Sequence, residues 1–297
     1  MIRPEAILGA EGLDTALGTD PRSGEHHQMR RALFCHRLSP LGASELPGLK
    51  IPPAAGSGPH EGFVDEVESR LGVTVEFFPV GNRTTAINAL RFEQVDIVLA
   101  GPSEYVLMAE RVPGTKAVTA IVRPEYYSVF IAPTDSDIET LEDLKGKHVA
   151  MKDHGSTTGH IMPSYMLSQA GLDIDRDLRI SLLDGARMQA LASGEVDAVG
   201  TGVRDFAPFV AQHGEENYRI IERGQDMPGD PMVAGPHISA ECVSEMQEAF
   251  MNDPDGLLQA ILAPGERDKY IGAEMVLVED SEYDMVRESY ALLGLSD

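Results

Sequence analysis

The chain has 297 residues, 42% of them hydrophobic, which is typical of a globular protein with room for one large domain or two lobes of about 100–150 residues each. Its 48 acidic and 24 basic side chains give a formal net charge of -24. This charge argues against a nucleic acid or an anionic membrane as partner, because both require a basic surface. Two cysteines, Cys35 and Cys242, are too few for a disulfide framework and too scattered for a zinc or redox motif.

The first 46 residues are rich in glycine, proline, serine and charged side chains and show no helical or strand periodicity. We therefore expect residues 1–46 to form a loosely ordered extension. No apolar run in the sequence reaches the length of a transmembrane helix, and no signal peptide can be read from it.

From Leu49 onward the chain alternates predicted strands with predicted helices. Continuous apolar strands separated by amphipathic helices favour a parallel sheet covered on both faces. In chain order the pattern predicts a strand near 49–51, a helix at 62–71, a strand at 73–78, a helix at 84–92, a strand at 95–100, a helix from Glu104, and strands at 117–122 and 127–132.

The alternation repeats in the middle of the chain, with strands at 148–151, 179–182 and 198–201 and helices at 161–170 and 187–193. We therefore expect an α/β protein of two lobes, each a mainly parallel sheet flanked by helices. Residues 47–126 with 232–297 form lobe 1 and residues 127–231 form lobe 2. The chain is expected to cross between them near 123–127 and 225–233.

One junction in the second lobe has the features of an anion cradle. After the strand at 148–151, Gly155 frees the turn, and Ser156, Thr157 and Thr158 offer hydroxyls beside the unpaired N–H groups of the helix that follows. On this junction alone the same residues are better interpreted as an ordinary helix cap, since capping is their commonest role. The choice between the two depends on the rest of the chain.

Catalytic motifs are not found in this sequence. It has no nucleophile elbow, no His/Cys/carboxylate cluster with metal spacing, and no glycine-rich phosphate loop followed by lysine. We therefore expect neither an enzyme nor a metal or cofactor. An enzyme of the same architecture stays open, because a fold does not fix a function.

Five segments resemble motifs of one protein family, in the order in which that family has them. They read ALRFEQVDIV at 89–98, GPSEY at 101–105, LEDLKGKHV with GSTTGH at 141–149 and 155–160, LASGEVDA at 191–198, and MPGDPMV at 227–233. The family is the phosphate/phosphite/phosphonate group of ABC-transporter substrate-binding proteins. The resemblance implies the type II periplasmic-binding fold, two lobes with a ligand cleft between them.

The chain departs from the family pattern at two turns. Gly81-Asn82-Arg83-Thr84 stands where the family has an aromatic "TDY" turn, and Asp184-Gly185-Ala186-Arg187 stands where it has a histidine in a "GSH" turn. Either the pocket is reshaped or Arg83 and Arg187 have taken over the anion. A guanidinium can grip an oxyanion through two parallel hydrogen bonds, but each arginine could also be a solvated residue at the start of a helix.

The resemblance implies further ligand contacts. It favours Ser156, Thr157 and Thr158 as a true cradle. The hydroxyl of Tyr105 either reaches the ligand or its ring packs under the loop, and either Tyr126 or Tyr127 is expected to face the cleft. Asp230 makes sense in an anion site only if the ligand carries a proton or an ammonium group; otherwise it is a turn residue before Pro231.

We therefore expect a monomeric binding protein that captures a small phosphorus oxyanion, phosphonate or phosphite, and presents it to a membrane permease. By resemblance it faces the periplasm or the exterior. A ligand sensor for a two-component system, an enzyme of related fold, and a copy that folds but no longer binds are the alternatives. The identity of the oxyanion is left open by the sequence.

Overall fold

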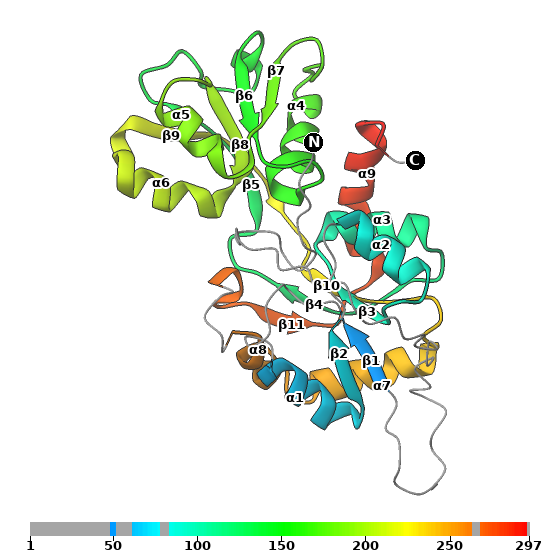
Figure 1. Cartoon of the computed structure of the whole chain (residues 1–297). Helices are drawn as coiled ribbons and strands as arrows, with labels where there is room; N and C mark the ends of the chain where they lie inside the picture. The colour runs from blue at the N-terminus through cyan, green and yellow to red at the C-terminus, as the bar shows by residue number, and fades with distance from the viewer. Residues whose placement is uncertain (1–47, 52–60, 78–82, 263–267, 296–297) are drawn as a thin grey trace, which may run out of the picture. The chain divides into compact units, whose positions relative to one another are not determined.

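The computed structural model describes residues 48–51, 61–77, 83–262 and 268–295 (Figure 1). The extension expected at residues 1–46 lies outside the described residues. By its internal contacts the chain divides into two compact units. Unit 1 comprises the described residues up to Gly101 together with Leu107–Val122 and Asp230–Glu279; unit 2 comprises Pro102–Val106, Arg123–Gly229 and the described residues from Asp280 onward.

Unit 1 contains a parallel pair of strands and a four-stranded sheet with the order β11-β4-β10-β3. Its described elements are β1 (Gly48–Ile51), α1 (Glu61–Leu71), β2 (Thr74–Phe77), α2 (Arg83–Arg91), β3 (Ile97–Leu99), α3 (Pro102–Arg111), β4 (Lys116–Val122), β10 (Asp230–Ala234), α7 (Ala240–Met251), α8 (Pro254–Leu262), a 3-10 turn η6 (Asp268–Tyr270) and β11 (Glu274–Val276). The first turn of α3 is counted with unit 2.

The core of unit 1 lies between these strands and the helices α1, α7 and α8, which run together along one side of the strands in Figure 1. Val67 of α1 and Phe250 of α7 are buried against strand residues such as Ile97 and Val118. These apolar positions recur at helical spacing on the helices, which is why the helices lie on the sheet.

Unit 2 contains one five-stranded sheet with the order β7-β6-β8-β5-β9. Its strands are β5 (Tyr127–Pro133), β6 (His148–Met151), β7 (Arg179–Leu182), β8 (Ala198–Gly202) and β9 (Tyr218–Asp226); its helices are α4 (Met162–Gln169), α5 (Arg187–Ala192), α6 (Phe206–His213) and α9 (Asp284–Leu292). Short helical turns are η1 (Glu142–Leu144), η2 (Thr157–Ile161), η3 (Asp184–Ala186), η4 (Val203–Asp205), η5 (Glu215–Asn217) and η7 (Asp280–Tyr283).

Helices cover both faces of the unit 2 sheet. Phe130 of β5 packs with Met166 and Leu167 of α4, whereas its neighbour Ile131 packs with Leu191 of α5 and Phe209 of α6. Successive strand residues point to opposite faces, so a continuous apolar strand needs a helix layer on each side. The predicted α/β class is thereby confirmed.

The prediction of mainly parallel sheets is wrong in part. In unit 1, β10 lies between β3 and β4 and runs antiparallel to both. In unit 2, β5 runs antiparallel to β8 and β9, whereas β6 pairs in parallel with β7 and β8. A parallel pair needs a helical crossover between its strands, and β10 enters its sheet directly from β9 of the other unit instead.

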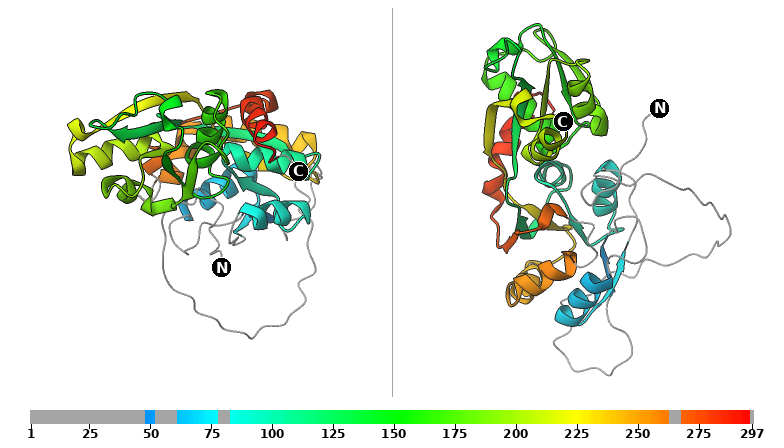
Figure 2. Two further views of the ribbon diagram at one scale, coloured as in Figure 1. Left: turned by 90° about the horizontal axis from the view of Figure 1, so that it is seen from above. Right: turned by 90° about the vertical axis from the view of Figure 1, so that its left-hand side faces the viewer.

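The C-terminal helix belongs to unit 2. Helix α9, red in Figures 1 and 2, packs against α4, and the hydroxyl of Ser289 lies 3.4 Å from the sulfur of Met162. The expected boundaries had placed this segment in lobe 1.

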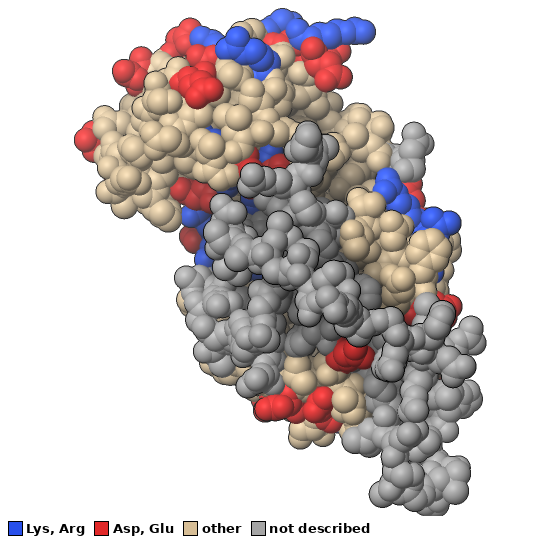
Figure 3. All heavy atoms as spheres, in the orientation of Figure 1, with Lys and Arg blue, Asp and Glu red and all other residues tan. Residues whose placement is uncertain are grey.

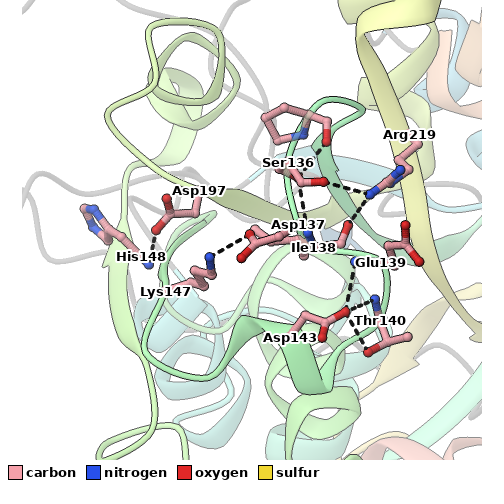
Figure 4. Close-up of polar contacts among 11 residues, drawn as sticks. Ser136, Asp137, Ile138, Glu139, Thr140, Asp143, Lys147, His148, Asp197 and Arg219 are labelled. Carbon is pink, nitrogen blue, oxygen red and sulfur yellow. Dashed lines mark hydrogen bonds and ion pairs between the residues drawn. The ribbon is translucent and has the colours of Figure 1, made fainter.

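The loop before β6 is held by polar contacts (Figure 4). Arg219 of β9 donates to the carbonyl oxygens of Ser136 and Ile138, and the Asp143 carboxylate accepts from the N–H groups of Glu139 and Thr140. These backbone donors, first that of Glu139, hold the pKa of Asp143 below its ordinary value. The loop that precedes β6 is thus bonded to β9 and within itself.

Charged side chains of both signs gather at the end of unit 2 above β6 and β7, on the face shown in Figure 3. The loops before these strands contain the ion pairs Lys145–Asp177, at 2.9 Å, and Lys147–Asp137, at 2.8 Å. Because each of these lysines faces a carboxylate, this end is not a cationic surface.

Candidate oxyanion site

The predicted cradle forms one turn of π-helix at the start of α4. Ser156 has an extended backbone, and its carbonyl oxygen accepts from the N–H groups of both His160, at 3.0 Å, and Ile161, at 2.9 Å. The N–H groups of Thr157, Thr158 and Gly159 come before the first bond of the turn, so the turn gives them no partner. Three consecutive donors are therefore left at the positive end of the η2–α4 helix.

Gly159 allows this turn to pack against the end of β6. The N–H of Lys152 donates to the Gly159 carbonyl at 2.8 Å, and a Cβ atom on Gly159 would lie only 2.5 Å from Cβ of Lys152. A side chain at Gly159 would force the turn off the strand. Glycine here is required by the close approach.

Thr157 is buried, and its contact with the first turn of α3 was not foreseen from the sequence. The N–H of Ser103 donates to Oγ1 of Thr157 at 3.3 Å, which leaves the Thr157 hydroxyl proton available for another acceptor. Ser103 itself is fully buried. The only indication of Ser103 in the sequence is that it follows the buried strand β3 and stands at the start of a helix.

Ser156 and Thr158 complete the cradle. Ser156 is buried and makes no side-chain capping bond to the turn, so the structure gives no support to its reading as an ordinary cap. The carbonyl oxygen of Thr158 accepts from the hydroxyl of Ser128, on β5, at 2.9 Å.

Tyr105 lies in the same first turn of α3, but its hydroxyl is held by the protein. It donates to Oδ1 of Asp280 at 2.6 Å, and its ring meets that of Tyr283 edge-on, with centroids 4.5 Å apart. Burial, and then the Asp280 carboxylate, raise the pKa of Tyr105 far above its ordinary value.

Tyr127 and Tyr126 are each covered by an arginine. The guanidinium of Arg223 lies 3.6 Å from the ring centre of Tyr127, and that of Arg123 lies 3.6 Å from the ring centre of Tyr126. Tyr126 is buried and Tyr127 is half-buried against the core on the α5 and α6 side. Both rings thus serve first as platforms for cations.

Arg187 is buried within a network of its own unit. Its Nε donates to Oγ1 of Thr201 at 2.9 Å, and one terminal nitrogen pairs with the carboxylate of Asp205 at 2.5 Å. Its other terminal nitrogen donates to the carbonyl of Asp184. All three nitrogen groups of this guanidinium therefore have protein acceptors in the structure.

Asp230 belongs to unit 1, where it is buried at the start of β10. Its carboxylate accepts from the hydroxyl of Tyr270 at 2.8 Å and pairs with Lys269 at 3.3 Å. The Lys269 ammonium group offsets the negative charge of the Asp230 carboxylate. Arg83 is the first residue of α2, and its side chain lies outside the described part of the chain.

The predicted residues are distributed over both units. Ser156, Thr157 and Thr158 form one turn, which the start of α3 joins through Ser103. Tyr127 and Arg187 also lie in unit 2, and Asp230 lies in unit 1. Among the described residues no group of His, Cys, Asp or Glu could hold a metal ion, and none of the described helices is long and apolar enough to cross a membrane.

A family model described as "ABC transporter, phosphonate, periplasmic substrate-binding protein" matches residues 59–275. The chain belongs to this family. The family is that of a transporter's substrate-binding component, as the five sequence segments implied, and its periplasmic character agrees with the predicted compartment.

Relatives named for phosphonate and phosphite binding match parts of the chain. The phosphonates-binding periplasmic protein of Escherichia coli (strain K12) is 27% identical over 201 residues, which are 64% of this chain and 60% of that protein. A probable ABC transporter phosphite binding protein, PhnD1, of Prochlorococcus marinus (strain MIT 9301) is 29% identical over 119 residues, 38% of this chain and 40% of that protein. The chain thus spans 60% or less of the length of these relatives.

Solved structures confirm the predicted fold. PhnD1 from Prochlorococcus marinus (MIT 9301), solved in complex with methylphosphonate, is similar with a TM-score of 0.62 and 20% identity, covering 84% of this chain and 98% of that one. XAC2383 from Xanthomonas citri, solved bound to ATP, has a TM-score of 0.68 and 16% identity with the same coverage. Both are similar over nearly the whole of their own chains, and the type II periplasmic-binding architecture is confirmed.

Proposed function

We propose that this protein captures a small phosphorus oxyanion, phosphonate or phosphite, and delivers it unchanged to an ABC permease. Membership of the substrate-binding family supports the role, and the names of its relatives support the ligand class. The protein acts as a monomer in the periplasm, with the permease as its membrane partner. It supplies binding and presentation, and no chemical step.

The observation that carries the proposal is the turn at 157–161. It presents three consecutive N–H groups without a partner in the turn, together with the hydroxyls of Ser156, Thr157 and Thr158. The oxygens of a phosphonate or phosphite accept hydrogen bonds in several directions, and donors at a helix N-terminus also meet them with a favourable dipole. The turn therefore matches a tetrahedral anion better than it matches a neutral solute.

Asp230 bears on which phosphonate is bound. An unpaired carboxylate would require a ligand with an ammonium group, but Asp230 already pairs with Lys269 and accepts from Tyr270. A ligand without an amine, such as methylphosphonate or phosphite, is therefore compatible with this residue.

Isothermal titration tests the proposal. Phosphate, phosphite, methylphosphonate, 2-aminoethylphosphonate and, as a negative control, a neutral sugar are titrated into the folded protein. We expect at least one phosphorus oxyanion to bind, and phosphorus NMR of the released ligand to show it unchanged. A folded protein that binds none of the four would contradict the proposal.

Variants of Thr157 locate the binding in the cradle. Thr157→Ala is expected to weaken binding roughly 10–100-fold, the equivalent of a hydrogen bond to a charged group, about 1.5–3 kcal/mol. Thr157→Ser keeps the hydroxyl and should retain most of the affinity. Thr119→Ala, at a fully buried threonine on β4 of unit 1, is the matched control and should bind as the wild type does.

A further inference from the structure

The cradle rests on two neighbouring strands at a point where one of them has no side chain. Ser128 of β5 and Gly202 of β8 lie directly opposite each other in an antiparallel pair. Residues that are directly opposite in such a pair project to the same face of the sheet. Both therefore face the segment that contains Thr158.

Gly202 leaves the space that the Thr158 side chain occupies. A Cβ atom on Gly202 would lie 2.9 Å from Oγ1 of Thr158, closer than a side chain can be accommodated without movement. The backbone of Gly202 has φ -71° and ψ 143°, which any residue can adopt. The requirement for glycine at this position is therefore set by Thr158 and not by the backbone.

Gly200 extends the same arrangement two residues along β8. A Cβ atom there would lie 2.9 Å from Cβ of Pro163, in the first turn of α4, and 3.1 Å from the ring of Phe130. Gly200 and Gly202 are two residues apart on β8 and therefore lie on the same face of the sheet. The η2–α4 segment packs directly on that face at both glycines.

Ser128 sets the distance between the turn and the strands. Its side chain is fully buried, and its hydroxyl donates to the Thr158 carbonyl at 2.9 Å. This bond joins β5 to the turn whose N–H groups form the cradle. A steric contact and a hydrogen bond thus meet at one residue, Thr158.

We propose that Ser128 and Gly202 are positioning residues for the anion cradle: together they set where Thr158 and the donors beside it stand, and so set the affinity for the oxyanion. The role rests on the proposed function, and neither residue touches the ligand. Gly202→Ala turns the Thr158 hydroxyl away or moves the turn off the sheet, and Ser128→Ala leaves the turn without its bond to β5.

A double-mutant cycle with Thr158 tests the proposal. In the wild-type background Gly202→Ala is expected to weaken binding of methylphosphonate, or of whichever oxyanion in the panel binds best, roughly tenfold or more, the equivalent of one hydrogen bond to a charged group. In a Thr158→Ala background the same change should cost less than about twofold, because the atom it collides with is gone. Equal losses in both backgrounds would overturn the proposal.

Two matched controls separate positioning from general damage. Gly62→Ala adds a methyl group in α1 of unit 1, where the nearest atom, the carbonyl oxygen of Ala260, lies at 3.9 Å, and should leave the affinity unchanged. Ser136→Ala removes a serine that, like Ser128, donates to a carbonyl, here Pro133 at 2.7 Å, in the loop drawn in Figure 4. Ser128→Ala should weaken binding and Ser136→Ala should not.

Amide hydrogen exchange decides the matter even if no oxyanion binds. Exchange of the amides of His160 and Ile161, which bond the Ser156 carbonyl, and of Lys152, which bonds the Gly159 carbonyl, should accelerate in Gly202→Ala and Ser128→Ala relative to the wild type, and should be restored in Gly202→Ala by Thr158→Ala. Exchange unchanged from that of the wild type would overturn the positioning role. Failure of the wild type to bind, with accelerated exchange in the variants, would overturn the proposed function alone.

Discussion

Tyr105 belongs to a motif that implies a ligand contact, but in the structure its hydroxyl and ring contact other residues of the protein. Its hydroxyl bonds Asp280 and its ring is buried. Tyr105→Phe is expected to lower the free energy of unfolding by about 1–2 kcal/mol, the value of a hydrogen bond to a charged group that is partly exposed. Urea denaturation measures the loss, and an unchanged unfolding midpoint would count against it.

The same residue predicts a pH dependence. Folding raises the pKa of Tyr105, mainly through burial, so the native state holds the phenol proton more tightly than the unfolded chain, in which the pKa is about 10. Stability from this residue is complete below pH 10 and is lost as the pH rises beyond it. Wild type and Tyr105→Phe should therefore converge in unfolding free energy between about pH 10.5 and 11.5.

Arg187 is expected to act on stability before it acts on binding. Arg187→Ala leaves the Asp205 carboxylate, which is 29% exposed, without its cation. We expect a loss of roughly 2–4 kcal/mol in unfolding free energy, below the upper end for fully buried pairs because water reaches Asp205. Denaturant unfolding checks this value.

The double variant Arg187→Ala with Asp205→Ala serves as the control, since it removes both charges and should recover part of the loss. If Arg187→Ala is instead as stable as the wild type but does not bind the oxyanion, the main role of Arg187 is to contact the ligand.

The candidate site was only partly predictable from the sequence. Ser156 to Thr158 were recognised because their chemistry is local: hydroxyls and free N–H groups at a helix start lie within a few residues. The partners of Tyr105 and Arg187 lie at Asp280 and Asp205, and no local pattern shows which carboxylate a distant fold will bring near. Ser128 and Gly202 were missed for the same reason.

At the scale of an element, α7 offers a prediction on helix capping in unit 1. The side chain of Ser239 accepts from the N–H of Cys242 at 3.2 Å. Ser239→Ala should destabilise the protein by about 1 kcal/mol, whereas Ser239→Asp should retain most of the stability because it also caps and favours the helix dipole. Thermal unfolding of the two variants, side by side, distinguishes the cap from a simple change at an exposed position.

Elements were predicted better than their pairing. The strand at 148–151 agrees with β6, because burial imposes an apolar run that the sequence shows directly, and the strand at 179–182 agrees with β7, an edge strand that is not buried. Strand direction depends on how the chain returns from the other unit, and this is why the antiparallel position of β10 could not be read from its own residues. The sequence predicts an ordinary helix where the structure has the π-helical turn, because one extra residue in a turn leaves the spacing of the apolar residues almost unchanged.

For the whole molecule, binding should stabilise and compact the chain. A ligand at a hundred times its dissociation constant adds about 2.7 kcal/mol to the native state. If the chain closes around its ligand at the crossings near 123–127 and 225–233, small-angle scattering with methylphosphonate should report a smaller radius of gyration than without it. At a ligand concentration of about three times the wild-type dissociation constant, where the wild type is mostly bound, the Thr157→Ala protein with its roughly 10–100-fold weaker binding should keep close to the larger radius.

The π-helical turn has a consequence for how this protein tolerates changes in chain length. A turn closed by Ile161 onto Ser156 holds one residue more than an α-helical turn. Deleting one residue between these two would let the backbone close as an ordinary α-helix, so the protein should still fold; three N–H groups would still precede the first bond, but the residues that supply them and the directions in which they point would change. Sequence alignments that open a one-residue gap here therefore mark a change in the anion site, and such chains should not be assumed to share its ligand.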